Sequence, residues 1–371
     1  MKIVVSAINL RSGGTLSVLL DVLKTVNQKQ FEKITFVFLI SSKKLIPFET
    51  SSHIEFIEFP VARSAYIVRL YYEYCYFYFL SRKIKPDFWL SLHDTSPILH
   101  NTAQGVYFHN PTPFSKPELK ELILQPKLFL FKILYTVIYR FNIHSNNYVI
   151  VQQNWIKTRV VENYGIKDDK VIVAIPKIDF TLDTDSIFTD TNQELTFFYP
   201  AFPRLFKNFE IIAGAMKTLE NEGIKNYRVL ITINGRENLY SRYVKFKFRK
   251  IKNIHFTGLL TREKTIETLN NSKCLLFPSK LETWGLPLSE AIFLKKDIIV
   301  SDLDYAKATV GNYSNVSFFN PNDKLQLARI MKEYIKNRTI VRNRALFEIK
   351  SNHILESWEE TIKFLVQCIK K

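Results

Sequence analysis

Short apolar runs alternate with segments of helical spacing along the first half of the chain. Apolar runs bounded by polar or turn-forming residues predict buried strands, and apolar residues that recur every three or four positions predict helices. The pattern predicts helices at residues 16–26 and near residues 155–164. It predicts strands at residues 2–8, 34–40, 53–59, 89–92, 105–108, 148–152 and 171–175.

The same alternation returns in the second half of the chain. Residues 177–194 are rich in acidic residues and threonine and hold no long apolar run, so we interpret them as a linker. Beyond them the pattern predicts strands at residues 195–199, 227–233, 254–257, 274–277 and 297–301, and helices at residues 209–219, 263–271, 288–294, 323–337 and 357–370. Strands that alternate with helices form parallel sheets covered on both faces. The expected fold class is therefore α/β, with two Rossmann-like parallel-sheet domains.

Length and composition agree with a two-domain globular protein. The 371 residues are enough for two domains, and a hydrophobic content of 46% supports real cores. Three widely spaced cysteines give neither a disulfide framework nor metal-ligand spacing, which indicates a reducing cytosol. The first residues predict a strand and not a signal peptide, and no stretch predicts a membrane span. The formal charge of +17 implies acidic partners, but charge alone does not choose between nucleic acid and an anionic membrane.

The most informative stretch, residues 277–302, reads FPSKLETWGLPLSEAIFLKKDIIVSD. A helix is expected to start at Pro287 or Leu288, because proline is tolerated in a first turn. Glu290 then lies in the first turn, and Glu282 lies in the loop before it. The two carboxylates would flank a helix N-terminus that favours an anion, which fits a nucleotide-sugar with hydroxyls at both ends and phosphate between them. The alternative is a surface loop with two solvated glutamates.

Three further groups of residues could contact such a ligand. Arg204 and Lys207 follow the first strand of the second domain, and they either hold a diphosphate or are solvated loop charges. Gly13 and Gly14 follow the first strand of the chain, where they either let the backbone approach a phosphate or form an ordinary turn. His109 directly follows an apolar strand, and it is either a structural hydrogen-bonding residue or part of a site.

The string from Glu282 to Glu290 resembles the donor-site signature of retaining GT-B glycosyltransferases of the family 4, or group 1, type. Their recurring pattern is Glu-x-Phe-Gly-x-Pro-x-x-Glu-Ala. Trp284 stands at the phenylalanine position, and Lys295 and Asp297 stand where the family often has Gly-x-Pro. The loop with Lys207 and the segment IHFTGLL, which would hold the nucleotide base, also resemble the family.

The resemblance implies the GT-B plan, in which two domains face each other across a cleft. Residues 1–176 would bind the acceptor, and residues 195–352 would bind the nucleotide-sugar. Residues 353–371 would return as a helix to the first domain.

The resemblance also implies a role for each candidate residue. Glu290 would bind the ribose hydroxyls, and Glu282 a hydroxyl of the transferred sugar. Arg204 and Lys207 would neutralise the leaving diphosphate, so neither a metal nor a cofactor is expected. His109 and Glu282 are the expected catalytic residues, and the other donor-binding residues would be Gly13, Gly14, Thr283, Trp284, Gly285 and Leu286. The Asp-Thr-Asp string at residues 183–185 is interpreted as solvated linker.

The expected activity is retaining hexosyl transfer from a UDP- or GDP-sugar to a glycan. Family analogy and positive charge predict a lipid-linked acceptor in bacterial surface polysaccharide synthesis, such as an O-antigen or capsule repeat. Core burial explains most rings of two aromatic and basic segments, residues 66–85 and 127–141, but rings exposed together with cations would make an anionic-membrane surface. The expected location is the cytoplasm, at the inner face of the membrane, with no nucleic-acid partner.

Two alternative functions remain open at this point. An epimerase-like GT-B enzyme would act on the nucleotide-sugar without transferring the sugar. A basic protein that binds membrane or nucleic acid would carry a degenerate donor site. The cationic run at residues 242–252 does not favour the second alternative, because a solvated helix face explains it.

Overall fold

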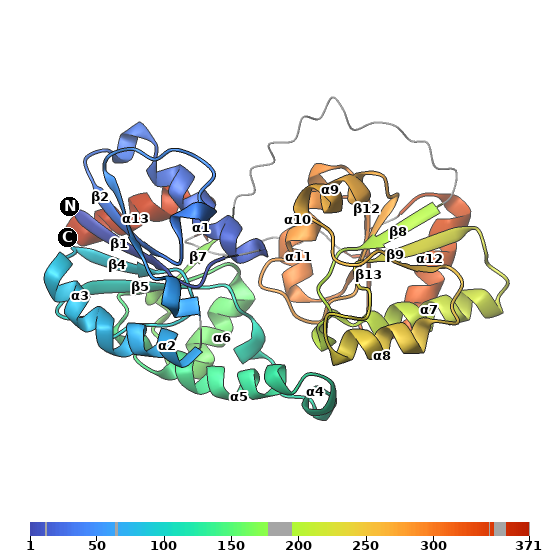
Figure 1. The fold of residues 1–371 in the computed structure, drawn as a ribbon. Helices are drawn as coiled ribbons and strands as arrows, with labels where there is room; N and C mark the ends of the chain where they lie inside the picture. The colour runs from blue at the N-terminus through green and yellow to red at the C-terminus, as the bar shows by residue number, and fades with distance from the viewer. Residues whose placement is uncertain (12, 64–65, 177–194, 341, 345–353, 371) are drawn as a thin grey trace. The chain divides into compact units, whose positions relative to one another are not determined.

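The computed structural model describes residues 1–11, 13–63, 66–176, 195–340, 342–344 and 354–370. The chain divides into two compact units, each built on one parallel sheet (Figure 1). The first unit comprises Met1–Phe114, Ile133–Lys177 and Ser351–Lys371, and the second comprises Ser115–Lys132 and Ile178–Lys350. The prediction of two parallel-sheet α/β domains is confirmed. The expected linker at 177–194, with its Asp-Thr-Asp string, lies outside the described residues.

The sheet of the first unit has eight parallel strands in the order β14-β7-β6-β5-β4-β1-β2-β3. Their bounds are β1 Lys2–Ala7, β2 Thr35–Ile40, β3 Ile54–Glu58, β4 Phe88–Ser91, β5 Ala103–Phe108, β6 Tyr148–Val151, β7 Val171–Ala174 and β14 Ile354–Leu355. The helices of this unit are α1 Gly13–Val26, α2 Tyr66–Tyr71, α3 Phe77–Ile84, α6 Asn154–Tyr164 and α13 Trp358–Lys370. Helix α5, Pro126–Arg140, belongs to this unit from Ile133 onward. A π-helical turn, Tyr72–Tyr76, joins α2 to α3.

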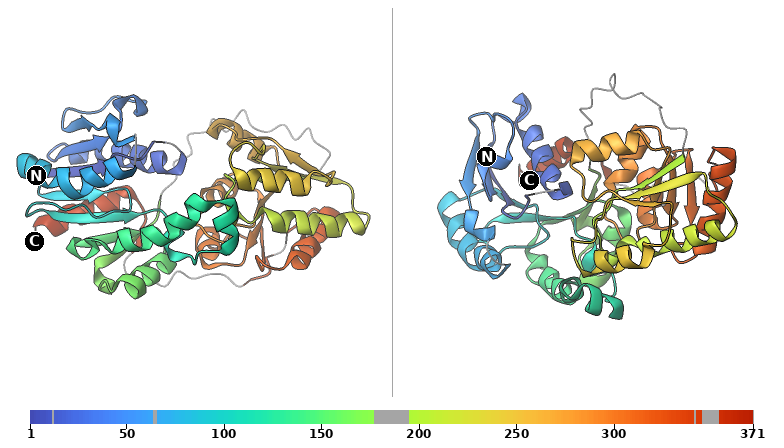
Figure 2. Two further views of the ribbon diagram at one scale, coloured as in Figure 1. Left: turned by 60° about the horizontal axis from the view of Figure 1, so that its bottom comes forward. Right: turned by 45° about the vertical axis from the view of Figure 1, so that its right-hand side comes forward.

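Helices bury separate apolar clusters on the two faces of this sheet. Ile3 and Val5 of β1 belong to a cluster that also contains the buried side chains of α1 and α13. Val4 of β1 belongs to a cluster on the opposite face, together with residues of α3. This alternation follows the two-residue period of a strand, and burial on both faces explains why the strands are continuous apolar runs. Helix α13 lies beside α1 in each view (Figure 2).

The sheet of the second unit has six parallel strands in the order β10-β9-β8-β11-β12-β13. Their bounds are β8 Leu195–Tyr199, β9 Tyr227–Ile231, β10 Ile254–Phe256, β11 Cys274–Phe277, β12 Asp297–Ser301 and β13 Val316–Phe319. The helices of this unit are α4 Leu119–Leu124, α7 Phe209–Asn221, α8 Leu239–Phe248, α9 Arg262–Asn270, α10 Leu286–Phe293, α11 Asp304–Val310 and α12 Lys324–Asn337.

Residues 115–132 belong to the second unit, although the sequence boundary assigned them to the first domain. Three polar contacts explain the difference. Lys120 forms an ion pair with Glu210 at the start of α7. The side chain of Gln125 donates to the carbonyl of Pro203 at 2.8 Å and accepts from the amide of Leu205 at 2.9 Å. Side chains distant in sequence make these contacts, so the local pattern did not reveal them.

The predicted start of one helix is wrong, and the helix expected in the cationic run is confirmed over part of that run. Helix α10 begins at Leu286, so Glu290 is its fifth residue and lies just beyond the first turn. The cationic run at 242–252 does carry a helix, but α8 begins earlier, at Leu239, and ends at Phe248. Its buried residues include Val244, and its cations face outward, as expected. No helix in the described ranges combines the length and the apolar composition needed to cross a bilayer.

Candidate functional site

The strand order of the second sheet reverses between β8 and β11. At such a point the loops that follow the two strands diverge, and open parallel sheets bind ligands there, at the carboxyl ends of the strands. Arg204 and Lys207 lie in the loop after β8, and residues 282–285 lie in the loop after β11. Most residues that the sequence nominated for the donor are therefore brought to one edge of one sheet.

Lys207 and Glu282 form an ion pair although 75 positions separate them. Their side chains are 17% and 14% exposed, so the pair is only partly open to solvent. The buried hydroxyl of Tyr199 donates to the carbonyl of Lys207 at 2.8 Å and fixes the backbone there. The ammonium lies 5.9 Å from the ring centroid of Phe277, an apolar wall that limits hydration of the charge. The pair thus places one cation and one carboxylate at the sheet edge with reduced solvent screening.

Arg204 supplies a second cation three residues before Lys207. Its guanidinium lies 5.2 Å from the ring centroid of Phe202. Burial lowers the pKa of Arg204, because a charged group loses hydration. No carboxylate of the described residues forms an ion pair with it. A partly buried cation without a carboxylate partner is suited to bind an anion.

The turn before α10 depends on glycine at position 285. Gly285 adopts φ +82°, a left-handed conformation that favours glycine. A Cβ added there would lie 3.2 Å from a methyl carbon of Leu288. Trp284 is held on both sides, because its indole donates to the hydroxyl of Ser289 at 2.9 Å and its carbonyl accepts from Thr309. Residues 283–286 therefore present the amino end of α10 in one conformation, and its free N–H groups favour an anion.

Glu290 is 4% exposed, and Arg262 at the start of α9 is its ion-pair partner, at 3.2 Å. Burial raises the pKa of Glu290, and the charge and hydrogen bond of Arg262 lower it in part. The net shift is upward. Arg262 was missed by the sequence reasoning. The available signal was a cation at the first position of a helix, where the helix dipole disfavours positive charge.

Lys295 stands where the resembled family often has glycine, and nothing in the structure explains the lysine. Lys295 adopts φ +53°, in the left-handed region that glycine favours. Its amide donates to the carbonyl of Ile292 at 3.0 Å, and Lys296 donates to Ala291 at 2.8 Å. The turn after α10 is therefore formed without glycine, at the cost of some backbone strain.

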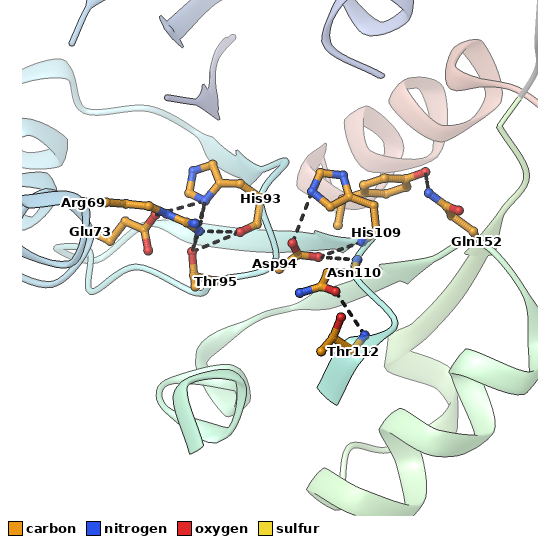
Figure 3. Close-up of polar contacts among 10 residues, drawn as sticks. Arg69, Glu73, His93, Asp94, Thr95, His109, Asn110, Thr112 and Gln152 are labelled. Atoms are coloured by element: carbon orange, nitrogen blue, oxygen red, sulfur yellow. Dashed lines mark hydrogen bonds and ion pairs between the residues drawn. The ribbon is translucent and has the colours of Figure 1, made fainter. Parts of the chain in front are cut away.

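The first unit carries its own polar cluster where its strand order reverses, between β1 and β4. Asp94, in the loop after β4, accepts from the backbone amides of His109 at 2.7 Å and Asn110 at 3.1 Å. Its second oxygen lies 3.2 Å from Nε2 of His109, and both side chains are 8% exposed (Figure 3). Burial favours a raised pKa for Asp94, but the contacts with His109 and the amides outweigh it, and the pKa is lowered. Asp94 is thus a buried carboxylate that orients the imidazole of His109.

The neighbouring residue, His93, enters a second buried cluster (Figure 3). Glu73 of the π-helical turn is fully buried, 2.6 Å from Nε of Arg69 and 3.1 Å from Nδ1 of His93. Nη2 of Arg69 donates to the carbonyl of His93 at 2.7 Å and to the hydroxyl of Thr95 at 3.1 Å. The other ring nitrogen of His93 lies 2.8 Å from the hydroxyl of Ser6. This cluster holds the loop from which Asp94 reaches His109.

Sequence reasoning found His109 but missed the residues around it. Arg69 and Glu73 lie four positions apart within the aromatic segment at 66–85. Residues at that spacing meet on one helix face, so the sequence could have indicated this ion pair. Gly13 and Gly14 open α1, and Gly13 adopts φ +60°. These glycines and His109 belong to the first unit, whereas Arg204, Lys207 and the 282–290 string belong to the second. Among the residues that the structure describes, no three histidine, cysteine or acidic side chains cluster as metal ligands do.

Comparison with known proteins links the second unit to one family and the whole chain to one fold. Residues 179–348 match the model of the family described as glycosyl transferases group 1. No curated protein matches the chain.

Several solved structures share the fold over almost the whole chain. Sucrose-phosphate synthase from Thermosynechococcus elongatus superposes with a TM-score of 0.66 at 13% identity, covering 91% of this chain and 90% of that one. WaaG, a glycosyltransferase involved in lipopolysaccharide biosynthesis, gives 0.64 at 14% identity and 91% coverage of both chains. HepE of Anabaena in complex with UDP-glucose gives 0.63 at 12% identity, covering 91% and 90%. The shared fold is that of GT-B glycosyltransferases.

Proposed function

We propose that this protein is a glycosyltransferase that takes its sugar from a nucleotide diphosphate. The observation that carries the proposal is the Lys207–Glu282 pair with Arg204 beside it, at the strand-order reversal of the unit that matches glycosyl transferases group 1. Two cations at such an edge suit a diphosphate, and nearby carboxylates suit sugar hydroxyls.

Each side chain has a role in the proposed reaction. Arg204 and Lys207 neutralise the charge that develops on the leaving diphosphate, so no metal is required for that step. Glu290 accepts hydrogen bonds from the ribose hydroxyls, and Glu282 from a hydroxyl of the transferred sugar. His109, held by Asp94, contacts the sugar as the bond to the diphosphate breaks. We propose a hexosyl group and retention of anomeric configuration.

The proposed donor is a UDP- or GDP-sugar. The structural neighbour HepE has been solved with UDP-glucose, which supports a nucleotide-sugar for this chain. The proposed acceptor is a lipid-linked glycan of bacterial surface polysaccharide synthesis, an O-antigen or capsule repeat. The neighbour WaaG takes part in lipopolysaccharide biosynthesis, which supports that assignment.

Nucleotide binding tests the donor site directly. We expect either UDP or GDP to raise the melting temperature by several degrees, since a ligand at 100 times its dissociation constant stabilises by about 2.7 kcal/mol. Glu290→Ala should lose the shift, and ADP should give none. Donor consumption that occurs only with a glycan acceptor excludes an epimerase. No shift with any nucleotide, and binding to nucleic acid instead, would refute the proposal.

The pH dependence of UDP binding should change when Arg262 is removed. Protonation of Glu290 removes an acceptor for the ribose, so affinity should fall as the pH drops through the pKa of Glu290. Burial raises that pKa and Arg262 offsets part of the rise, so Arg262→Ala raises the pKa further. The variant should therefore lose affinity at a higher pH than the wild type. Calorimetric titrations at a series of pH values measure this.

Lys264→Ala is the matched control for Arg262→Ala. Lys264 lies on the same helix, is exposed, and pairs with Glu267 instead of Glu290. Its removal should leave the pH profile of UDP affinity unchanged. Coincident profiles for Arg262→Ala and the wild type would show that Glu290 does not need this arginine to stay ionised.

Helix α5 presents an apolar face to solvent, which supports a location at a membrane surface. It buries the ammonium of Lys132 against Glu121 at 2.6 Å, with both side chains at most 2% exposed. The residues that it exposes are instead largely apolar: Leu130, Phe131, Ile133, Leu134 and Val137, with Phe141 just after the helix. Lys127 and Arg140 are exposed on the same helix, and the chain carries a charge of +17. An apolar face with flanking cations fits the interface of an anionic membrane, and we propose peripheral attachment at the cytoplasmic face.

Liposome co-sedimentation tests this attachment. Leu134→Glu/Val137→Glu should reduce binding to vesicles of phosphatidylglycerol and phosphatidylcholine several-fold, because the acidic side chains oppose both insertion and attraction. Leu239→Glu/Leu325→Glu is the control, since both leucines are more than half exposed on helices of the second unit. Equal binding by wild type and α5 variant, or equal binding to vesicles without anionic lipid, would count against the proposal.

A further inference from the structure

The residue directly after Lys207, Asn208, has a buried side chain that helix capping does not explain. It is 7% exposed, and its backbone adopts φ +57°, a left-handed conformation that asparagine tolerates better than most residues. Asn208 occupies the N-cap of α7, where an asparagine side chain usually accepts from a backbone amide of the first turn. This side chain makes no such contact. The backbone conformation favours asparagine or glycine here, but it does not explain what the side chain does.

The side-chain amide of Asn208 joins three loops at the carboxyl edge of the second sheet. Its nitrogen donates to the carbonyl of Pro321 at 2.8 Å and to the carbonyl of Pro278 at 3.2 Å. Both partners only accept, so the NH2 group must face them, and both of its hydrogens are used. Asn208 ends the loop after β8, Pro278 directly follows β11, and Pro321 lies shortly after β13. One buried side chain therefore holds these three loops together.

Contacts on both sides of Lys207 run to the segment just before Glu282. The carbonyl of the preceding residue, Phe206, accepts from the amide of Lys280 at 2.7 Å. The following residue donates to Pro278, as described above. Lys280 and Pro278 lie two and four positions before Glu282. The loop that carries the cation is thus fastened at two points to the loop that carries the carboxylate, and these two points fix where the two side chains meet.

We propose that Asn208 is a positioning residue for the Lys207–Glu282 pair. Both hydrogens of its amide are used by loop carbonyls, so it acts through Lys207 and not on the substrate. The inference rests on the proposed transfer reaction, in which Lys207 stabilises the charge on the leaving diphosphate. Such stabilisation requires a charged group that is already in place when the charge develops. A displacement of about 1 Å at a reacting centre can lower the rate about 100-fold.

Asn208→Gly tests this role, because glycine keeps the left-handed backbone and removes only the side-chain amide. The variant should lower kcat for sugar transfer about 10- to 100-fold and change the KM for the nucleotide-sugar by less than about threefold. Arg338→Gly is the matched control: Arg338 also adopts φ +57°, at the end of α12 in the same unit, and its side chain is exposed. Its kcat should stay within about twofold of the wild type. Melting curves check that both variants are folded.

A double variant distinguishes positioning of Lys207 from a general loosening of the second unit. If Asn208 acts through Lys207, Lys207→Ala/Asn208→Gly should transfer sugar within about twofold of the rate of Lys207→Ala, because residues that act as a unit are not additive. A merely structural defect would lower kcat by the same factor in both backgrounds. Equal factors in the two backgrounds would overturn the inference, and so would a wild-type kcat in Asn208→Gly.

Lysine acetylation followed by mass spectrometry tests the position of Lys207 without an assay of transfer. The side chain of Lys207 is partly buried and paired with Glu282, so it should react slowly with acetic anhydride in the wild type. In Asn208→Gly it should react several-fold faster, while the exposed Lys225 should react equally in both proteins. Equal reactivity of Lys207 in the two proteins would overturn the inference. If Lys207 reacts faster in the variant but the wild type binds neither UDP nor GDP, the placement of Lys207 by Asn208 stands and the proposed function fails.

Discussion

Lys207→Ala is expected to lower the rate of sugar transfer by about 100- to 1,000-fold, the usual effect of removing one group that stabilises developing negative charge. The side chain of Lys207 is only 17% exposed, so the attraction of its ammonium for a diphosphate is weakly screened. Removal also leaves Glu282 without its cation beside the phosphates. Steady-state assays with the preferred nucleotide-sugar measure the effect, which should fall mainly on kcat.

Two further variants distinguish the loss of the Lys207 charge at this position from a general loss of positive charge and from repulsion by the unpaired Glu282. Lys225→Ala removes an exposed lysine at the other edge of the same sheet and should leave the rate within about twofold. Lys207→Ala/Glu282→Gln removes the carboxylate that would repel the diphosphate, so it should bind UDP more tightly than Lys207→Ala alone. If Lys207→Ala transfers sugar at nearly the wild-type rate, Lys207 does not stabilise the leaving diphosphate. The proposed donor site would then be wrong in its central residue.

Glu73→Gln is expected to lower the free energy of unfolding of the first unit by about 3–5 kcal/mol, because it leaves Arg69 buried without a counter-charge. The two side chains are 0% and 8% exposed. Burial favours a raised pKa for Glu73, but the charges of Arg69 and His93 outweigh it, and the pKa is lowered. The stability that ionised Glu73 contributes is therefore present above its unfolded-state pKa and lost as the pH falls towards the folded value. The variant should lose less stability on acidification than the wild type.

Urea unfolding followed by tryptophan fluorescence suits this measurement, because three of the four tryptophans, Trp89, Trp155 and Trp358, lie in the first unit. Glu55→Gln is the control: Glu55 is an exposed carboxylate on β3, and its change should stay within about 0.5 kcal/mol. Arg69→Met/Glu73→Leu should recover most of the stability, since apolar pairs replace buried ion pairs well. If Glu73→Gln lowers the free energy of unfolding by less than about 1 kcal/mol, the Arg69–Glu73–His93 cluster does not hold the loop that carries Asp94.

The strands could be located from the sequence because of where they lie in the fold. A strand covered by helices on both faces needs apolar residues at every position, so β8, β11 and β12 stand out as short apolar runs with the predicted bounds. Elements with mixed composition were harder to find. Helix α11 and strand β13 were not predicted, because short segments without a clear period carry little local signal.

The sequence by itself determined the α/β class, the two sheets, and the local strings that carry Lys207, Glu282, Glu290 and His109. Those features depend on residue periodicity and on neighbours along the chain. Only the tertiary structure decided that Lys207 pairs with Glu282, that Arg262 pairs with Glu290, and that Asp94 orients His109. Each pair joins residues from different elements, and its strength depends on burial. The physical reason is that desolvation and distance arise when distant segments pack together, and no local pattern records them.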